Sequence, residues 1–250
     1  DSPEKVGRVE SLLAGMQDAV YPALLETLAA SDDRGVRKTV LDILQTGGGV
    51  PLRHIWPLME DPRWYVVRNA LQLATASEDP EVAGRVERLT RHPDYRVRRE
   101  AVRSLTTLEG TKHLSDFTRL LKDEDSGVRM LAARGLASHG TKGQLPAVKS
   151  QVEAKDLDTR PAEEVEALLT AYAVLGGDEA VEALNRIWKR RVFGTRPLMV
   201  RLAAVSALGA LSTPAAQRSL SEAVGSREAQ IERAARTVSG IQALAKGPDS

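Results

Sequence analysis

The sequence predicts an all-α protein built from repeated helix pairs, and three observations lead to this prediction. Apolar residues recur at three- and four-residue spacing, which places them on one face of a helix. No segment alternates apolar and polar residues beside an Asn-Gly or Asp-Gly turn, so the signals of β-strands are missing. The chain is also similar to itself at a nearly constant interval, which indicates a stack of similar units.

Seven segments of the chain share one pattern, and the first four of them fit it best. Each has a polar or Pro-bearing turn, then an apolar anchor, then a small or β-branched residue four places later and an apolar residue four places further. The anchors are Val36, Val66, Val97, Val128, Val165, Val200 and Ile231. Their successive intervals are 30, 31, 31, 37, 35 and 31 residues, so the two longer intervals indicate insertions.

A second amphipathic stretch precedes each anchored segment, so the repeat consists of a first and a second helix. The expected first helices cover residues 20–29, 52–60, 82–91, 114–122, 145–154, 180–190 and 215–224. An extra helix is expected over residues 5–16, within the first 16 residues. Such a pair cannot bury its apolar stripe alone, and stacking of neighbours completes the core. The prediction is one right-handed α-solenoid of about seven helix pairs over residues 1–250.

The segment Asp125-Ser126-Gly127-Val128-Arg129, followed by small and apolar residues at helical spacing, resembles the HEAT repeat. The resemblance is to the short bacterial kind of about 31 residues, and it extends from Val20 onward. It implies an α-solenoid fold. It implies little about function, because the family includes scaffolds, transport adaptors, nucleic-acid binders and a few enzymes.

Composition sets broad limits on function. The 35 basic and 34 acidic residues give a net charge of +1, so no global field requires a nucleic-acid or membrane partner. The absence of Cys removes disulfides, thiolate metal sites and cysteine nucleophiles, and it fits a reducing compartment. A cytoplasmic location is therefore expected, and the resemblance to the short bacterial repeat implies a bacterial protein. Because the chain begins at Asp1, we expect it to be part of a longer protein.

An Arg follows the anchor in four repeats, and we expect it to have a structural role. These residues are Arg37, Arg98, Arg129 and Arg201, whereas Val67, Glu166 and Glu232 occupy this place in other repeats. The interpretation is a ladder of Arg and turn carboxylates that joins neighbouring repeats. The expected partners are Asp33, Asp94 and Asp125.

The candidate binding residues lie two and six places after each anchor, where side chains are expected to point away from the core. The basic residues at these places are Lys38, Arg68, Arg99, Arg103 and Arg134. The next two repeats have Ala167, Ala171, Leu202 and Ser206 there, which predicts a groove that is basic in its first half and apolar in its second. These charges are either ordinary solvated surface or a site for an anionic partner, which Arg recognises through bidentate hydrogen bonds.

Two aromatic clusters are further candidates. Trp188 stands beside Arg190 and Arg191, and this cluster is interpreted either as a partner contact or as a helix end with Trp188 in the core. Trp64 and Tyr95 occupy matching places in adjacent repeats. Aromatic packing across one repeat interface is expected there, rather than a platform that stacks nucleic-acid bases.

Catalytic patterns are missing from the sequence. The four His residues stand alone, and there are no His-Glu dyads of the kind that hold iron in the HEAT-like deoxyhypusine hydroxylases. The resemblance also includes HEAT-like DNA glycosylases, whose basic groove needs a carboxylate, and Asp42 near Arg68 and Trp64 meets this need only loosely. The HEAT-like phycobilin lyase subunits share the repeat alone. We therefore expect no enzyme activity, no metal and no cofactor.

The leading hypothesis is a non-enzymatic scaffold that binds a protein, in particular an acidic segment, through the groove lined by the second helices. The alternative is a nucleic-acid-binding solenoid of the DNA-glycosylase type that uses the same basic residues. Because phosphate-backbone binding weakens steeply with salt, the salt dependence of binding separates the two hypotheses. The sequence does not specify the partner or the oligomeric state.

Overall fold

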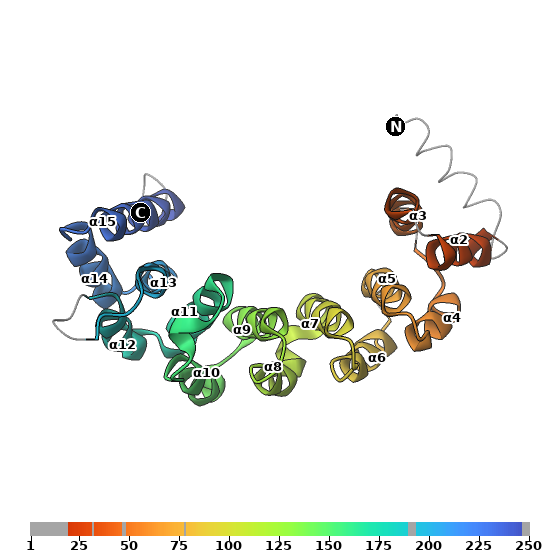
Figure 1. The fold of residues 1–250 in the computed structure, drawn as a ribbon, viewed down its shortest axis with the longest axis horizontal. Helices are drawn as coiled ribbons and strands as arrows, with labels where there is room; N and C mark the ends of the chain where they lie inside the picture. Colours follow the sequence, from red (N-terminus) through yellow and green to blue (C-terminus); the bar gives the residue numbers. More distant parts are fainter. Residues whose placement is uncertain (1–19, 32, 47–48, 78, 190–193, 247–250) are drawn as a thin grey trace. The chain divides into compact units, whose positions relative to one another are not determined.

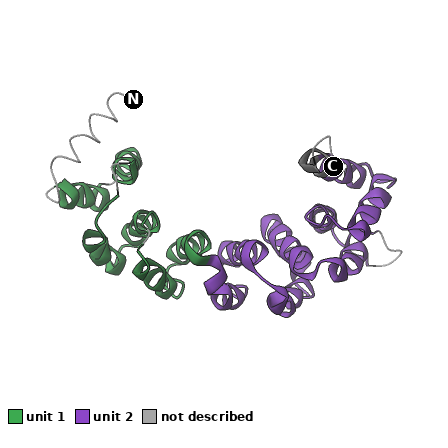
Figure 2. Cartoon of the chain, turned by 180° about the vertical axis from the view of Figure 1, so that it is seen from behind, with its two compact units in different colours: residues 1–109 green, residues 110–250 purple. Residues whose placement is uncertain are grey.

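The computed structural model describes residues 20–31, 33–46, 49–77, 79–189 and 194–246, and these residues form helices joined by short turns (Figure 1). No β-strand occurs in this part of the chain, as the sequence predicts. The chain divides into two compact units, residues 1–109 and residues 110–250 (Figure 2). The helix expected over residues 5–16 lies outside the described residues.

The described residues of unit 1 form three helix pairs, and each pair follows the predicted repeat. The elements are α2 (Val20–Ala30), α3 (Arg34–Thr46), α4 (Leu52–Ile55), a 3-10 turn (Trp56–Glu60), α5 (Trp64–Thr75), α6 (Glu81–Leu89) and α7 (Tyr95–Glu109). The second helices α3, α5 and α7 lie in one layer, with α5 in contact with both of the others (Figure 1). The first helices α2, α4 and α6 form the other layer.

The first helix of the second pair is shorter than predicted. The sequence pattern predicts one helix over residues 52–60, whereas the α-helix ends at Ile55 and a 3-10 turn continues to Glu60. Pro57 gives the physical reason, because it has no backbone N–H to donate within an α-helix and its ring crowds the preceding turn. The apolar face of this segment still packs into the core, since Ile55 and Met59 are buried.

Unit 2 contains four further helix pairs in the same order. The α-helices are α8 (Leu114–Leu120), α9 (Ser126–His139), α10 (Leu145–Val152), α11 (Ala162–Gly176), α12 (Asp178–Trp188), α13 (Leu198–Leu208), α14 (Pro214–Val224) and α15 (Ala229–Lys246). Short 3-10 turns cover Gly110–His113, Lys142–Gln144 and Leu157–Thr159. The second helices contact one another in sequence, α9 with α11, α11 with α13 and α13 with α15.

The helix ends in unit 2 have the expected polar and glycine signals. The Asp125 carboxylate accepts a hydrogen bond from the Val128 backbone N–H at 2.9 Å and caps the start of α9. Gly177, between α11 and α12, has a φ of +55°, which lies in the left-handed region that disfavours other residues. The short turns of the repeat are therefore fixed locally by the sequence.

Six of the seven predicted anchors are buried, and one is not. Val66, Val97, Val128, Val165, Val200 and Ile231 are at most 2% exposed, whereas Val36 is 40% exposed. The prediction for Val36 is wrong: α3 packs mainly on α2 and α5, and Val36 is not among the residues of α3 that this packing buries. Val40 and Leu44, one and two turns further along α3, are buried in its place.

Candidate functional site

The second helices of unit 1 carry a local excess of positive charge. Helices α3, α5 and α7 together have eight basic and three acidic residues, whereas α9, α11 and α13 of unit 2 have three of each. The basic residues of these three helices of unit 1 are Arg34, Arg37, Lys38, Arg68, Arg96, Arg98, Arg99 and Arg103. A protein with almost no net charge thus has a local positive field on one layer of one unit.

The four predicted binding residues of unit 1 lie on these three helices in different environments. Lys38 on α3 is exposed, and Arg68 on α5 is half-buried. On α7, the Arg99 guanidinium lies 4.8 Å from the centroid of the Tyr95 ring. Arg103 is exposed but donates to Glu100 at 3.2 Å, so its charge is partly compensated. We name α3, α5 and α7 with these side chains the basic surface of unit 1.

Trp64 and Tyr95 do interact across the interface of α5 and α7, but through a cation rather than by ring packing. The Arg96 guanidinium carbon lies 3.6 Å from the Trp64 ring centroid and 5.6 Å from the Tyr95 centroid. The ring contact at this place is Trp64 with Tyr65 of the same helix, edge to face at 5.9 Å. The prediction of aromatic packing is therefore corrected to cation–π stacking by Arg96, whose charge is also paired with the Asp94 carboxylate at 2.7 Å.

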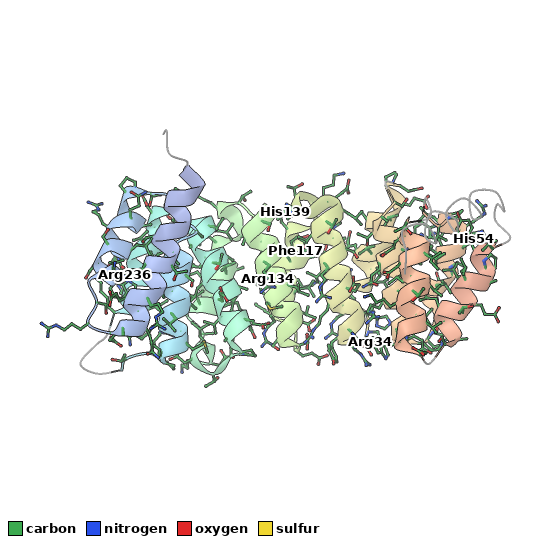
Figure 3. The ribbon with its side chains drawn as sticks, turned by 90° about the horizontal axis from the view of Figure 1, so that it is seen from above. Arg34, His54, Phe117, Arg134, His139 and Arg236 are labelled. Atoms are coloured by element: carbon green, nitrogen blue, oxygen red, sulfur yellow. The ribbon has the colours of Figure 1, made fainter. Side chains whose placement is uncertain are left out.

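A cavity of about 600 Å³ lies between α3 and α5 within the basic surface. Its lining residues are Arg34, Arg37, Lys38, Leu41, Trp64, Tyr65, Arg68 and Asn69. Four of the lining side chains are cations and none is a carboxylate. In Figure 3, Arg34 lies among side chains that end in nitrogen. The lining of the cavity therefore combines four cations with apolar and aromatic walls, and the Glu100 carboxylate acts on Arg68 from outside this lining.

Arg68 is the most constrained cation of the cavity. Its Nη2 donates to the Asn69 Oδ1 at 3.1 Å, and its Nε is buried and has no hydrogen-bond partner among the described residues. Burial lowers the pKa of Arg68, the charge of Glu100 raises it in part, and the charges of Arg37 and Arg34 lower it further. An anion in the cavity would reduce the repulsion between these arginines.

The Arg ladder exists in unit 2, but its carboxylates are not the predicted ones. Arg129 donates from Nε and Nη2 to the two carboxylate oxygens of Glu164, both at 2.7 Å. Arg201 forms the same bidentate pair with Glu228, at 2.6 and 2.8 Å. Hydrogen bonding to these carboxylates raises the pKa of both arginines. Each pair joins one repeat to the next, which confirms the structural role.

The turn carboxylates that were expected in this ladder serve the turns instead. Asp33 accepts hydrogen bonds from the backbone N–H groups of Gly35 and Val36. Asp94 accepts from the backbone and side chain of Arg96, and this pairing holds the pKa of Asp94 below its ordinary value. The helical arginines reach the turn through its carbonyls: Arg37 donates to the Ser31 oxygen and Arg98 to those of His92 and Pro93. The sequence identified the arginines correctly and assigned the wrong acceptors.

The predicted apolar half of the groove is not found at the fifth repeat. Ala167 and Ala171 on α11 are buried, because α11 is packed by α9 and α13 as well as by α10 and α12. Leu202 and Ser206 on α13 are half-buried. In unit 2, Arg134 on α9 is exposed as predicted (Figure 3).

Trp188 belongs to the core of unit 2. Its side chain is 5% exposed, its Nε1 donates to the Asn185 Oδ1 at 2.7 Å and its carbonyl accepts from Arg201 at 2.8 Å. This agrees with the alternative that Trp188 is a core residue, and it leaves little of the ring for a partner. Arg190 and Arg191 lie outside the described residues.

Two further cations line the cavity, Arg34, which the sequence pattern did not single out, and Arg37, which was predicted to have only a structural role. The signal was available, because Arg34, Arg37 and Lys38 follow one another at i, i+3 and i+4 and so share one face of α3. The prediction rested on the positions two and six places after the anchor, which on α3 are Lys38 and Asp42.

The described helices do not combine the length and hydropathy that crossing a membrane requires. Stacked antiparallel helix pairs with buried anchors define an α-solenoid, and residues 82–169 match the family model of HEAT repeats. Residues 82–169 of the chain are therefore similar to HEAT repeats, and the described helices have the all-α solenoid fold. No curated protein sequence matches it with significant similarity.

Several solved structures resemble the chain at low sequence identity. Human deoxyhypusine hydroxylase in complex with glycerol is 14% identical, with 95% of this chain and 98% of that chain covered and a TM-score of 0.37. An engineered protein is 17% identical over 88% of this chain and 67% of that chain, with a TM-score of 0.41. A designed armadillo repeat protein in complex with the peptide (KR)4 is 14% identical over 87% and 97%, with a TM-score of 0.32. Similarity at this level assigns no function.

Proposed function

We propose that this protein is a non-enzymatic scaffold that binds an acidic protein segment through the basic surface of unit 1. The observation that carries the proposal is the cavity between α3 and α5, where four cations line one space without a carboxylate. Cations that merely solubilise a helix commonly lie beside acidic residues, as Arg236 lies beside Glu232 on α15. The cations of the cavity lack such partners among its lining residues.

Geometry and charge favour a peptide as the bound group. Arg68 and Arg96 stack on Trp64, and Arg37 lies 5.9 Å from the Tyr65 ring centroid, so these flexible side chains are held near fixed positions. Arginines held in this way lose less conformational entropy when they bind a carboxylate. Since the positive charge is local and the net charge is only +1, a short acidic segment fits better than a long polyanion.

The proposal is tested with a short fluorescent peptide of alternating Glu and Gly, by fluorescence anisotropy on the full chain. The double variant Lys38→Glu with Arg99→Glu reverses one charge on α3 and one on α7. We expect it to weaken binding by about tenfold or more, because both residues contribute to the field of the basic surface. Helical circular dichroism should be unchanged, since neither side chain is part of the core.

The matched control is Arg218→Glu with Arg227→Glu, two exposed residues of unit 2, which changes the net charge equally. The control should bind the peptide like the parent. If the two double variants weaken binding to the same extent, only net charge matters and the basic surface is not the site.

Salt dependence decides between a protein and a nucleic acid as the partner. Binding of the acidic peptide should weaken modestly between about 50 and about 200 mM salt, whereas backbone binding of single-stranded DNA should fall steeply and log-linearly. Tighter binding of an oligothymidine than of the acidic peptide at the higher salt concentration would overturn the proposal in favour of nucleic-acid binding.

A further inference from the structure

The cavity between α3 and α5 has more positive charge than one carboxylate can neutralise. Arg34, Arg37, Lys38 and Arg68 line it, and none of its lining residues is acidic. An Asp or Glu side chain would bring a single negative charge and two acceptor oxygens. A phosphoryl group brings a charge of about −1.5 to −2 near neutral pH and three acceptor oxygens.

Arg68 supplies an independent observation at the same place. Its Nε is buried and has no hydrogen-bond partner among the described residues, although its Nη2 is bonded to Asn69. Buried donors are nearly always paired in folded proteins, so Arg68, which lines the cavity, is a guanidinium whose hydrogen bonds are incompletely satisfied within the described part of the chain. Asn69 and the Trp64 ring on either side hold the guanidinium in its orientation.

The volume and the lining of the cavity indicate that the anionic group is part of a larger ligand. A volume of about 600 Å³ is much larger than one phosphate ion needs, and Leu41, Trp64 and Tyr65 add apolar wall to the cations. This combination accommodates a charged group together with the chain that bears it. Clusters of Arg are also the usual means by which proteins recognise phosphorylated peptide segments.

We propose that the cavity between α3 and α5 is a binding site for a phosphorylated side chain of a peptide, with Arg68 and Arg34 as its main ligands. The inference rests on the proposed function, because it specifies the anionic group that the basic surface of unit 1 selects. It goes further in requiring that a phosphomonoester bind more tightly than a carboxylate in the same sequence.

The test uses three fluorescent peptides of identical Gly and Ser sequence, whose central residue is Ser, Glu or phosphoserine. Binding to the full chain is measured by anisotropy. We expect the phosphoserine peptide to bind about tenfold more tightly than the Glu peptide, because the additional charge and oxygen engage an additional arginine. The Ser peptide should bind more weakly than both.

Two variants locate the site. Arg68→Lys keeps the charge and removes the planar pair of donors, so it should weaken phosphoserine binding by about tenfold and binding of the Glu peptide much less. Arg34→Gln removes a cation from the exposed first turn of α3, where folding does not depend on it, and should also weaken phosphoserine binding. Arg218→Lys in unit 2 is the control and should leave all three affinities unchanged. If Arg68→Lys lowers the helical circular-dichroism signal, the phosphoserine affinity of Arg34→Gln is the test of the site.

The outcomes separate this inference from the proposed function. Equal affinities of the phosphoserine and Glu peptides, or an unchanged phosphoserine affinity in the folded variants, would overturn the phosphoryl site. The proposed function would then still stand if the alternating Glu and Gly peptide responds to Lys38→Glu with Arg99→Glu. Tighter binding of oligothymidine than of the phosphoserine peptide would show a phosphodiester site and would overturn both proposals.

Discussion

The arginine that follows the anchor contacts a carboxylate in one repeat of unit 2 and an aromatic ring in one repeat of unit 1. In unit 2, Arg129 follows the anchor Val128 and is paired with Glu164, which directly precedes the next anchor, Val165. In unit 1, Arg37 follows the anchor Val36, and Tyr65 directly precedes the next anchor, Val66. The Arg37 guanidinium lies 5.9 Å from the Tyr65 ring centroid. One repeat interface thus has a carboxylate where the other has an aromatic ring.

The carboxylate and the aromatic ring have different effects on the charge of the arginine that they contact. The bidentate pair neutralises Arg129, and Glu164 is only 1% exposed, so the charges of that interface are used within the fold. An aromatic ring holds a cation without neutralising it. The Arg37 charge of unit 1 is therefore held beside an aromatic ring, as the proposed function requires, whereas the Arg129 charge of unit 2 connects neighbouring helices.

The largest effect is expected from placing a charge on a buried anchor. Val97→Asp in unit 1 should lower the free energy of unfolding by about 5 kcal/mol, because the carboxylate would be buried without a partner at a fully buried position. Val36→Asp is the matched control and should cost less than about 1 kcal/mol, since Val36 is 40% exposed. Urea unfolding of both variants is the measurement. Similar losses for the two would contradict the assignment of Val36 to the surface.

The next effect concerns the buried carboxylate of unit 2. Glu164→Ala should lower the free energy of unfolding by about 3 kcal/mol, because Arg129 and Arg160 both donate to Glu164 and would lose that acceptor. Glu163→Ala on the same helix is exposed and should change the stability by less than about 0.5 kcal/mol. Thermal melts by circular dichroism test this. A loss below about 1 kcal/mol for Glu164→Ala would mean that the ion pair does not hold the interface.

The smallest effect on the free energy of unfolding is expected when Tyr65 of unit 1 is replaced by Glu, the residue type that pairs with the matching arginine in unit 2. The same change should have the clearest effect on peptide binding. Tyr65→Glu should change the free energy of unfolding by less than about 1 kcal/mol, since an exposed or half-exposed ion pair contributes little. The new carboxylate would neutralise part of the basic surface, so the acidic peptide should bind several-fold more weakly. Tyr65→Leu, which adds no charge, should affect peptide binding less. Unchanged binding by Tyr65→Glu would remove Arg37 and the cavity from the site.

The sequence alone determined the repeat and the helices. Val97, Ala101 and Leu105 are four residues apart, and any helix with that spacing has one apolar face that must be covered, so the pattern specified α7 and its burial before any contact was known. The sequence also identified Lys38, Arg68, Arg99 and Arg103, because their places in the repeat put them away from that apolar face. Local periodicity is sufficient for such predictions.

Tertiary structure decided which neighbour each side chain meets. Val36 is exposed and Ala171 is buried, although both positions were assigned from the same repeat pattern, because α3 packs mainly on two helices and α11 is packed by four. Arg129 could be recognised as a ladder residue from its position, but its pairing with Glu164 depends on a contact across 35 residues. The cavity beside Arg68 likewise requires α3 and α5 to lie side by side. Periodicity defines the face of one helix, whereas an ion pair or a cavity depends on the distance between two helices, which only packing sets.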